Sequence, residues 1–462
     1  MKKFFALLMA CLLVFGLAAC GDSAEESTTA ATSPMDVTYD FDVPTEDTQV
    51  RDIDLTVWAP QSELGENNNG WLVKQCEAFA AANPLWNIHW TFQAYTEEEA
   101  VAKVIEDPNS AADLFFFNSA QLPALLNAKV IIRQSGATLV QMEVDTVDGV
   151  VNTVSQGEAV YGVPYTTDSY VMYYDSSVFT QEDVKSLDAM LLKGKVAVPV
   201  TNGDFLASFY LANGCSFDAE RGINFSGEKG VAVTNYLAGL VKNQNFVNDV
   251  DAAGKEGLKA GTVKAFFSTA ANAVAAKEAL GEHYAVATLP AITLGEVTKQ
   301  LVPFSTTKAM GVNPKSSYPS VASALAAFLT TADAQLAHYE ANGTVPVAKE
   351  LLTGNDTFKT NAAYLLVAET TGKIAVVKPG LPQLPNYYTA AEALVNAILG
   401  GKVNDTTVQQ LLDDFRAAAN VAAEESVPQD TTPEETIPAD TTETTTEATT
   451  EVTTEATTEA TE

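Results

Sequence analysis

The amino-acid sequence predicts an α/β fold divided into two lobes. Strand-like and helix-like hydrophobic patterns alternate from Ile53 onward, which is typical of a mainly parallel sheet flanked by helices. These patterns extend over roughly 370 residues, more than a single hydrophobic core usually serves. The segments that flank them, 21–50 and 425–462, are acidic and poor in large apolar residues, so the folded part is expected to lie between them.

The first five elements are predicted in the order strand, helix, strand, helix, strand. Apolar residues alternate along 54–58 and 86–92, as in strands with one buried face. The apolar residues of 71–82 fall on one helical face, and a second helix is expected over 96–106. Residues 113–117, in which Asp113 precedes a continuous apolar run, suit a strand buried on both faces. Later segments continue the alternation, with strands over 195–198 and 284–289 and helices over 231–241, 321–329 and 408–415.

The N-terminus carries an export signal. Two lysines precede an uncharged run of 16 residues, 4–19, which is shorter than the roughly 20 residues that a membrane-spanning helix needs. Small residues then lead directly into Cys20, a pattern that resembles the bacterial lipobox. This resemblance implies a signal peptide over 1–19 and lipidation of Cys20. The composition of the residues that follow, rich in Ser, Thr, Ala, Asp and Glu, predicts a flexible tether over 20–50. The alternative is an ordinary secretory signal in which Cys20 is incidental.

The charge is concentrated at the two ends of the chain. The net charge is −33; residues 424–462 hold 12 acidic and no basic residues, and residues 21–50 hold 8 acidic and no basic residues. The segment 51–423 carries 39 acidic and 24 basic residues, so it is only moderately acidic. No basic stripe is present, which disfavours a nucleic-acid partner. The Thr/Glu repeats of 425–462 predict a disordered, self-repelling tail.

The sequence contains no motif of an enzyme or a metal site. G-x-S-x-G, H-E-x-x-H and P-loop patterns are absent, and the three histidines are isolated. Cys76 and Cys215 are far apart and are expected to be free, structural thiols. Carboxylates are numerous enough that a glycosidase pair stays open as a less favoured alternative. We therefore expect no catalytic residue, no metal and no cofactor.

Several ordered motifs resemble the maltose-binding protein type of extracellular solute-binding protein, which serves ABC sugar importers. The resemblance spans most of 53–420, and it rests on the order and spacing of the motifs together. They are LTVWAP at the first strand, ADLFFFN at 112–118, QGEAVYGVPYTTDSYVMYYD at 156–175, AFFSTAANAV at 265–274, YAVATLP at 284–290, AMGVNPKS at 309–316 and LPQLPNYYTAAEALVNAILGGK at 381–402.

The resemblance implies two lobes joined by crossing segments, with a ligand cleft that closes like a hinge. The crossings are expected at 165–168, 303–309 and 349–354. The N-lobe would combine 51–166 with 309–350. The C-lobe would combine 167–308 with 351–424, and Cys76 and Cys215 would then lie in different lobes.

The resemblance also implies a set of ligand-binding residues. Sugar sites use aromatic rings for the flat sugar faces and carboxylates or amides for the hydroxyls. The matching positions are Gln61, Ser62, Glu63, Phe117, Asn118, Asp168, Asp204, Phe205, Asn272, Tyr387 and Tyr388. Asp168 matches the binding carboxylate of the family, and the alternative is an ordinary aspartate in a turn. For Phe117 the alternative is a residue of the hydrophobic core, and for Gln61, Ser62 and Glu63 it is an exposed loop without a binding role. In this resemblance, Asn272 and Ala391 match positions where maltose-binding proteins carry stacking tryptophans, which leaves open another oligosaccharide or a smaller polar solute.

The function implied is capture of a carbohydrate, such as a maltodextrin, on the outer face of the cell membrane and delivery to the permease of an ABC importer. The protein would be lipid-anchored through Cys20 and would have no nucleic-acid partner. A non-sugar solute-binding protein and a surface sensor or scaffold are the alternatives.

Overall fold

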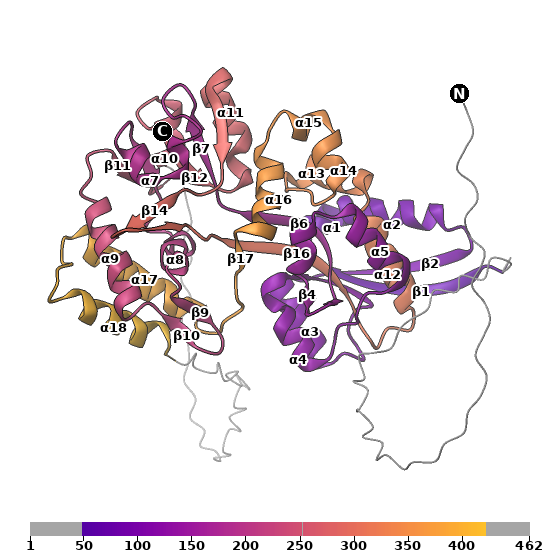
Figure 1. Ribbon diagram of the computed structural model, residues 1–462. Coiled ribbons are helices and arrows are strands. Elements are labelled where there is room, and N and C mark those ends of the chain that lie inside the picture. Colours follow the sequence, from indigo (N-terminus) through magenta and orange to yellow (C-terminus); the bar gives the residue numbers. More distant parts are fainter. Residues whose placement is uncertain (1–48, 252, 422–462) are drawn as a thin grey trace, which may run out of the picture. The chain divides into compact units, whose positions relative to one another are not determined.

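The computed structural model describes residues 49–251 and 253–421 (Figure 1). The expected signal peptide, Cys20, nearly all of the expected tether and the Thr/Glu-rich segment lie outside the described residues. Within the described residues, no helix is both long enough and apolar enough to span a bilayer.

A six-stranded mixed sheet is built around the first strand. Its order is β17-β16-β3-β1-β2, with β6 pairing to β16. The β1 strand is parallel to both β2 and β3, whereas β16 is antiparallel to β3 and β6. The strands are β1 (Arg51–Ala59), β2 (Trp86–Ala94), β3 (Leu114–Asn118), β6 (Val163–Ser169), β16 (Phe304–Val312) and β17 (Val376–Val377).

A second, five-stranded sheet has the order β11-β8-β12-β7-β13. Its strands are β7 (Val171–Asp175), β8 (Val196–Val198), β11 (Phe246–Asn248), β12 (Ala265–Ser268) and β13 (Tyr284–Ala287). The β8 strand is parallel to β11 and β12, and β7 is antiparallel to β12 and β13. Only Tyr170 separates β6 of the first sheet from β7 of the second, so the chain passes directly from one sheet to the other at this residue.

Three two-stranded ribbons, eighteen α-helices and five short 3₁₀ helices complete the described residues. The ribbons are β4 (Ser155–Gln156) with β5 (Ala159–Val160), β9 (Ser216–Asp218) with β10 (Gly222–Asn224), and β14 (Ala291–Leu294) with β15 (Val297–Gln300). The helices are α1 (Gln61–Leu64), α2 (Trp71–Ala82), α3 (Glu97–Glu106), α4 (Leu122–Ala128), α5 (Gly136–Asp145), α6 (Asp148–Asn152), α7 (Leu187–Leu191), α8 (Gly203–Ala212), α9 (Glu228–Leu240), α10 (Ala253–Lys259), α11 (Ala273–Leu280), α12 (Pro319–Leu329), α13 (Ala332–Asn342), α14 (Lys349–Gly354), α15 (Asp356–Lys359), α16 (Ala363–Lys373), α17 (Leu384–Leu399) and α18 (Val408–Ala419).

Local sequence explains the first helices and strands. The α3 helix begins with a capping box, in which the Thr96 side chain accepts from the Glu99 N–H and the Glu99 carboxylate accepts from the Thr96 N–H. The α2 helix buries Leu72, Cys76 and Phe79 on one face. The β3 strand is buried at four of its five residues, as its continuous apolar run predicts. The α/β fold class is confirmed.

The buried apolar residues form separate clusters. One cluster joins β1–β3 and their helices with residues from Ala309 to Leu329. A second combines apolar residues between Met172 and Phe304 with α17 and α18, and a third places residues between Val345 and Ala368 against β7 and β12. Cys76 lies in the first cluster and Cys215 in the second; both are buried and free, which confirms the expectation that they do not pair.

Candidate functional site

A cavity of about 480 Å³ opens beside the segment where the chain passes from the first sheet to the second. The paired strands β6 and β16 supply much of its wall, because Thr306 lies opposite Asp168 and Lys308 opposite Thr166 in their antiparallel register. The lining residues are Thr166–Tyr170, Asp204, Thr269–Ala271, Phe304, Thr306, Lys308, Asn342–Val345 and Lys378.

Asp168 places a carboxylate in this cavity. The Ser169 N–H donates a 2.9 Å hydrogen bond to its Oδ1, and the Thr269 side chain and Ala270 N–H are further donors. Burial raises the pKa of Asp168 to about 6, and these hydrogen bonds offset only part of that effect. None of the ion pairs formed among residues 49–251 and 253–421 involves Asp168. The carboxylate can therefore accept hydrogen bonds from a bound solute without first breaking a salt bridge.

A second group of polar side chains joins Asp204, Lys378 and Tyr388. Lys378 Nζ lies 2.8 Å from Asp204 Oδ2, and the Tyr388 hydroxyl donates to Asp204 Oδ1 at 2.9 Å. The Lys378 ammonium also lies 5.3 Å from the centroid of the Tyr388 ring. Burial lowers the pKa of Lys378, but the contacts with Asp204 and Tyr388 outweigh it, and the pKa is raised above its ordinary value. Lys378 is therefore a charged donor at the cavity wall.

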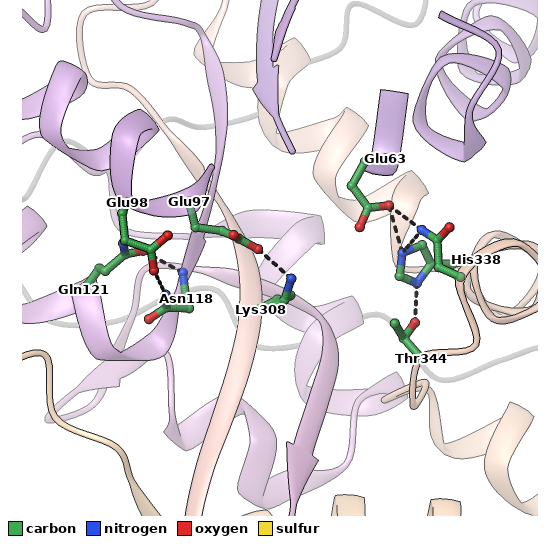
Figure 2. Close-up of polar contacts among 9 residues, drawn as sticks. Glu63, Glu97, Glu98, Asn118, Gln121, Lys308, His338 and Thr344 are labelled. Atoms are coloured by element: carbon green, nitrogen blue, oxygen red, sulfur yellow. Dashed lines mark hydrogen bonds and ion pairs between the residues drawn. The ribbon is translucent and has the colours of Figure 1, made fainter. Parts of the chain in front are cut away.

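Lys308 brings a further ammonium group to the cavity. Its Nζ lies 2.7 Å from Glu97 Oε1, at the start of α3 (Figure 2). Asn118 lies near this pair, donates to Glu98 Oε1 at 3.2 Å and has its own N–H capped by Gln121 at 2.9 Å. The Lys308–Glu97 pair fixes the ammonium group beside the cavity.

An aromatic surface lines the cavity next to Asp168. Tyr170 and Phe304 both belong to the lining. The Tyr170 ring packs edge-to-face on Phe205, with 5.2 Å between ring centroids, and Phe205 is fully buried. Burial raises the pKa of Tyr170 to about 12, so its hydroxyl stays protonated at neutral pH. Two carboxylates, two ammonium groups and aromatic rings thus surround one space, which suits a polyhydroxylated solute with flat apolar faces.

The structure brings together some of the residues predicted from sequence. Asp168 and Asp204 line the cavity, and Tyr388, 37% exposed, contacts Asp204. Asn272 follows the lining residues Thr269–Ala271 directly and donates to Ser268 Oγ at 2.8 Å. These residues form the part of the predicted set that lies at or next to the cavity.

The other predicted residues do not line this cavity. Phe117, Phe205 and Tyr387 are fully buried; Phe117 packs against Gly162, and the Tyr387 hydroxyl donates to Gly203 O at 2.6 Å. Gln61 and Ser62 are exposed on α1, and Asn118 is held by Glu98 and Gln121. Glu63 is buried and bonded to His338. Direct contact of these residues with a solute remains a prediction.

Sequence reasoning did not single out Tyr170, Thr269, Phe304, Lys308, Asn342–Val345 or Lys378. A usable signal existed for Phe304 and Lys308, because they lie in the segment 303–309 that was expected to cross between the lobes. Tyr170 and Thr269 lie inside two of the motifs that carry the family resemblance, 156–175 and 265–274. Lys378 and the turn Asn342–Val345 lie in segments that belong to none of the quoted motifs and none of the expected crossings.

The raised pKa of Asp168 predicts that Asp168→Asn stabilises the ligand-free protein at neutral pH. As the pH rises from about 4 to 6, the unfolded carboxylate ionises while the folded one still holds its proton, so wild-type stability is lost through this window. We expect the asparagine variant to exceed the wild type by about 1–3 kcal/mol at pH 7.5 and to match it at pH 4. Urea unfolding at both pH values measures this; an equal difference at the two values would show that burial does not destabilise the carboxylate.

Comparisons with known proteins identify the family. Residues 74–365 match the model described as "Bacterial extracellular solute-binding protein". A solved structure described as being "with acarbose" is 38% identical in sequence and has a TM-score of 0.62. The match covers 80% of this chain and 99% of that chain. The maltodextrin binding protein MalE1 from L. casei BL23 without ligand has 22% identity and a TM-score of 0.65, covering 80% of this chain and 100% of its own.

A third structure, a cyclo/maltodextrin-binding protein complexed with maltotetraose, has 18% identity and a TM-score of 0.62, covering 81% of this chain and 98% of its own. A search of curated proteins gave no match. The family and these neighbours bind solutes and are not enzymes. The chain belongs to the bacterial extracellular solute-binding proteins.

Proposed function

We propose that this protein captures an oligosaccharide of the maltodextrin class outside the cell and delivers it to the permease of an ABC importer. The observation that carries this proposal is the 38% identity, over 80% of the chain, to a protein whose structure is titled with acarbose, itself an oligosaccharide-like molecule. The two maltodextrin-binding neighbours share the fold, and their sequence identities of 22% and 18% add no evidence about individual binding residues.

The chemistry of the cavity supports a sugar. Asp168 offers two carboxylate oxygens that can accept hydrogen bonds from neighbouring hydroxyls, and Lys308 and Lys378 offer charged donors. The ring of Tyr170 offers an apolar face on which a sugar ring can stack. A volume of about 480 Å³ lies within the range of small-molecule sites, roughly 300–1,000 Å³.

We further propose that the chain forms an N-lobe of 51–166 with 309–350 and a C-lobe of 167–308 with 351–424. The passage between the sheets at Tyr170 and the long strand β16 are suited to act as hinge segments, because they connect the separate apolar clusters. Solute would favour a closed form by making contacts that exist only when both lobes touch it.

The location proposed is the outer face of the cell membrane, through a lipid on Cys20. The support is the sequence of the first twenty residues, in which a basic start and a short apolar run end at this cysteine. Metabolic labelling with a fatty acid should mark the wild-type protein and not a Cys20→Ala variant. Release of the wild type into the medium without label would contradict the anchor.

A thermal-shift screen tests the proposed solute. The purified protein is mixed with maltose, maltotetraose, acarbose, cellotetraose and several monosaccharides, and the sugars are recovered afterwards for chromatography. The proposal expects the unfolding temperature to rise with the α-linked oligosaccharides, since a ligand that binds only the folded state stabilises it. Recovery of unchanged sugar is also expected. A shift with none of the α-linked sugars would overturn the solute class, and cleavage products would contradict a binding role.

A further inference from the structure

Glu63 and His338 form a buried polar pair that the cavity lining does not include. Glu63 Oε2 lies 2.9 Å from His338 Nε2, and their side chains are only 4% and 2% exposed (Figure 2). Glu63 comes from α1, close to the start of the chain's folded part, whereas His338 comes from α13. A buried carboxylate and a buried imidazole are retained only where their hydrogen bonds are satisfied.

The remaining hydrogen bonds of this pair lead to the cavity wall. Asn342 Nδ2 donates to Glu63 Oε2 at 2.8 Å, and Thr344 Oγ1 lies 2.7 Å from His338 Nδ1. This part of the cavity wall is the turn Asn342–Val345, which begins at the last residue of α13. The Glu63–His338 pair therefore contacts the back of the cavity wall without lining the cavity itself.

The geometry orients the imidazole ring. Nε2 faces a carboxylate oxygen and so acts as the donor, and Nδ1 meets a hydroxyl that can either donate or accept. The ring is also enclosed by Trp71 and Tyr165, whose centroids lie 4.5 and 5.2 Å from it. Trp71 is itself fixed by a 2.8 Å hydrogen bond from Nε1 to Ala334 O in the same helix, α13. The imidazole cannot rotate without losing these contacts.

Other contacts hold the turn mainly at its far end, where Val345 is buried in the third apolar cluster. Gly343 ends α13 with a left-handed φ of 69°, and Asn342 and Gly343 are exposed. At the far end of the turn, Thr166 Oγ1 donates to Val345 O at 2.8 Å. The bonds from Glu63 and His338 thus hold one end of the turn, and Thr166 holds the other.

We propose that Glu63 and His338 are positioning residues that hold the turn Asn342–Val345 in the shape that the solute meets. This inference rests on the proposed function, in that the cavity must be the solute site. It replaces the expected direct contact between Glu63 and the solute with an indirect role. The turn would lose its place in the wall when either member of the pair is removed.

The test uses the full chain with Glu63→Gln and His338→Gln, and with Tyr210→Phe as a matched control. Tyr210 is fully buried and its hydroxyl lies 2.9 Å from Thr234 Oγ1, so the control also removes a buried polar contact, but one that does not touch the cavity. Three quantities are measured: the Kd for maltotetraose, the unfolding temperature, and amide hydrogen exchange over 342–345 without sugar.

We expect each of the two variants to raise the Kd about tenfold and to speed exchange over 342–345. The Kd of the double variant should be no higher than that of the single variant that binds less tightly, because residues in one network do not act additively. Tyr210→Phe should lower the unfolding temperature and leave the Kd and the local exchange unchanged. If the pair variants do not fold, Thr344→Val breaks the final bond of the network, and Thr344→Ser should restore binding.

Two results would overturn the inference. A Kd within twofold of the wild type together with unchanged exchange would show that the pair does not position the turn. Weaker binding with unchanged exchange would show that the pair affects binding by a route other than holding the turn. If the wild type binds no sugar, the proposed function fails, while the exchange measurement on the ligand-free variants still decides whether the pair positions the turn.

Discussion

Replacing Asp168 with alanine is expected to weaken maltotetraose binding at least a hundredfold. The variant removes both carboxylate oxygens from a cavity in which no salt bridge competes for them. A hydrogen bond to a charged group contributes about 1.5–3 kcal/mol, so two such bonds correspond to at least about 3 kcal/mol, or two orders of magnitude in Kd. Titration calorimetry of the two proteins at pH 7.5 measures the difference.

Asp188 offers a matched control for this variant. Its carboxylate also accepts hydrogen bonds, from the Tyr236 hydroxyl at 2.8 Å and from the Thr293 N–H at 3.0 Å, but it does not line the cavity. Asp188→Ala should therefore leave the Kd unchanged even if it lowers stability. If Asp168→Ala binds within threefold of the wild type, Asp168 does not bind the solute.

The second large effect concerns stability and arises where α6 meets α16. Gly149 and Gly372 approach so closely that a Cβ added to Gly149 would lie 1.7 Å from Gly372 Cα. The atoms that this Cβ would meet all belong to the backbone of Gly372, so the two helices would have to separate. We expect Gly149→Ala to lower the free energy of unfolding by about 3 kcal/mol, at the upper end of overpacking costs. The midpoint of urea unfolding reports this change.

A second helical glycine supplies the control for this variant. A Cβ added to Gly239, near the end of α9, would meet no atom within 4 Å. Gly239→Ala should stabilise the protein by about 0.5–1 kcal/mol, because alanine is the better helix former. A loss of stability in Gly149→Ala no greater than 0.5 kcal/mol would mean that the two helices are not in the close contact described.

Elements with strong local signals were predictable from sequence. The helix predicted over 71–82 coincides with α2, since its apolar residues share one face and Asn83 and Pro84 follow its end. The run 113–117 corresponds to β3 within a residue. Helix α13 was not predicted, because its buried residues include the polar Gln335 and His338, which remove the apolar periodicity. The segment 349–354, expected as a crossing, forms the helix α14.

The candidate site was predictable only where the chain itself marks it. Asp168 lies on β6, one of the strands leading between the sheets, and a family resemblance pointed to it. Lys308 enters the cavity through the pairing of β6 with β16, a contact between residues more than 130 positions apart that no local pattern encodes. Tyr170 directly follows the last residue of β6. Glu63 was identified as a polar residue of the first loop, but its partner His338 is 275 residues away, so its burial could not be predicted.

A crystal structure of the protein grown with maltotetraose tests the central claim most directly. The account predicts one sugar chain in the cavity, with hydroxyls within hydrogen-bond distance of Asp168 and a sugar ring against Tyr170. An empty cavity at saturating sugar, or sugar bound elsewhere on the protein, would contradict it.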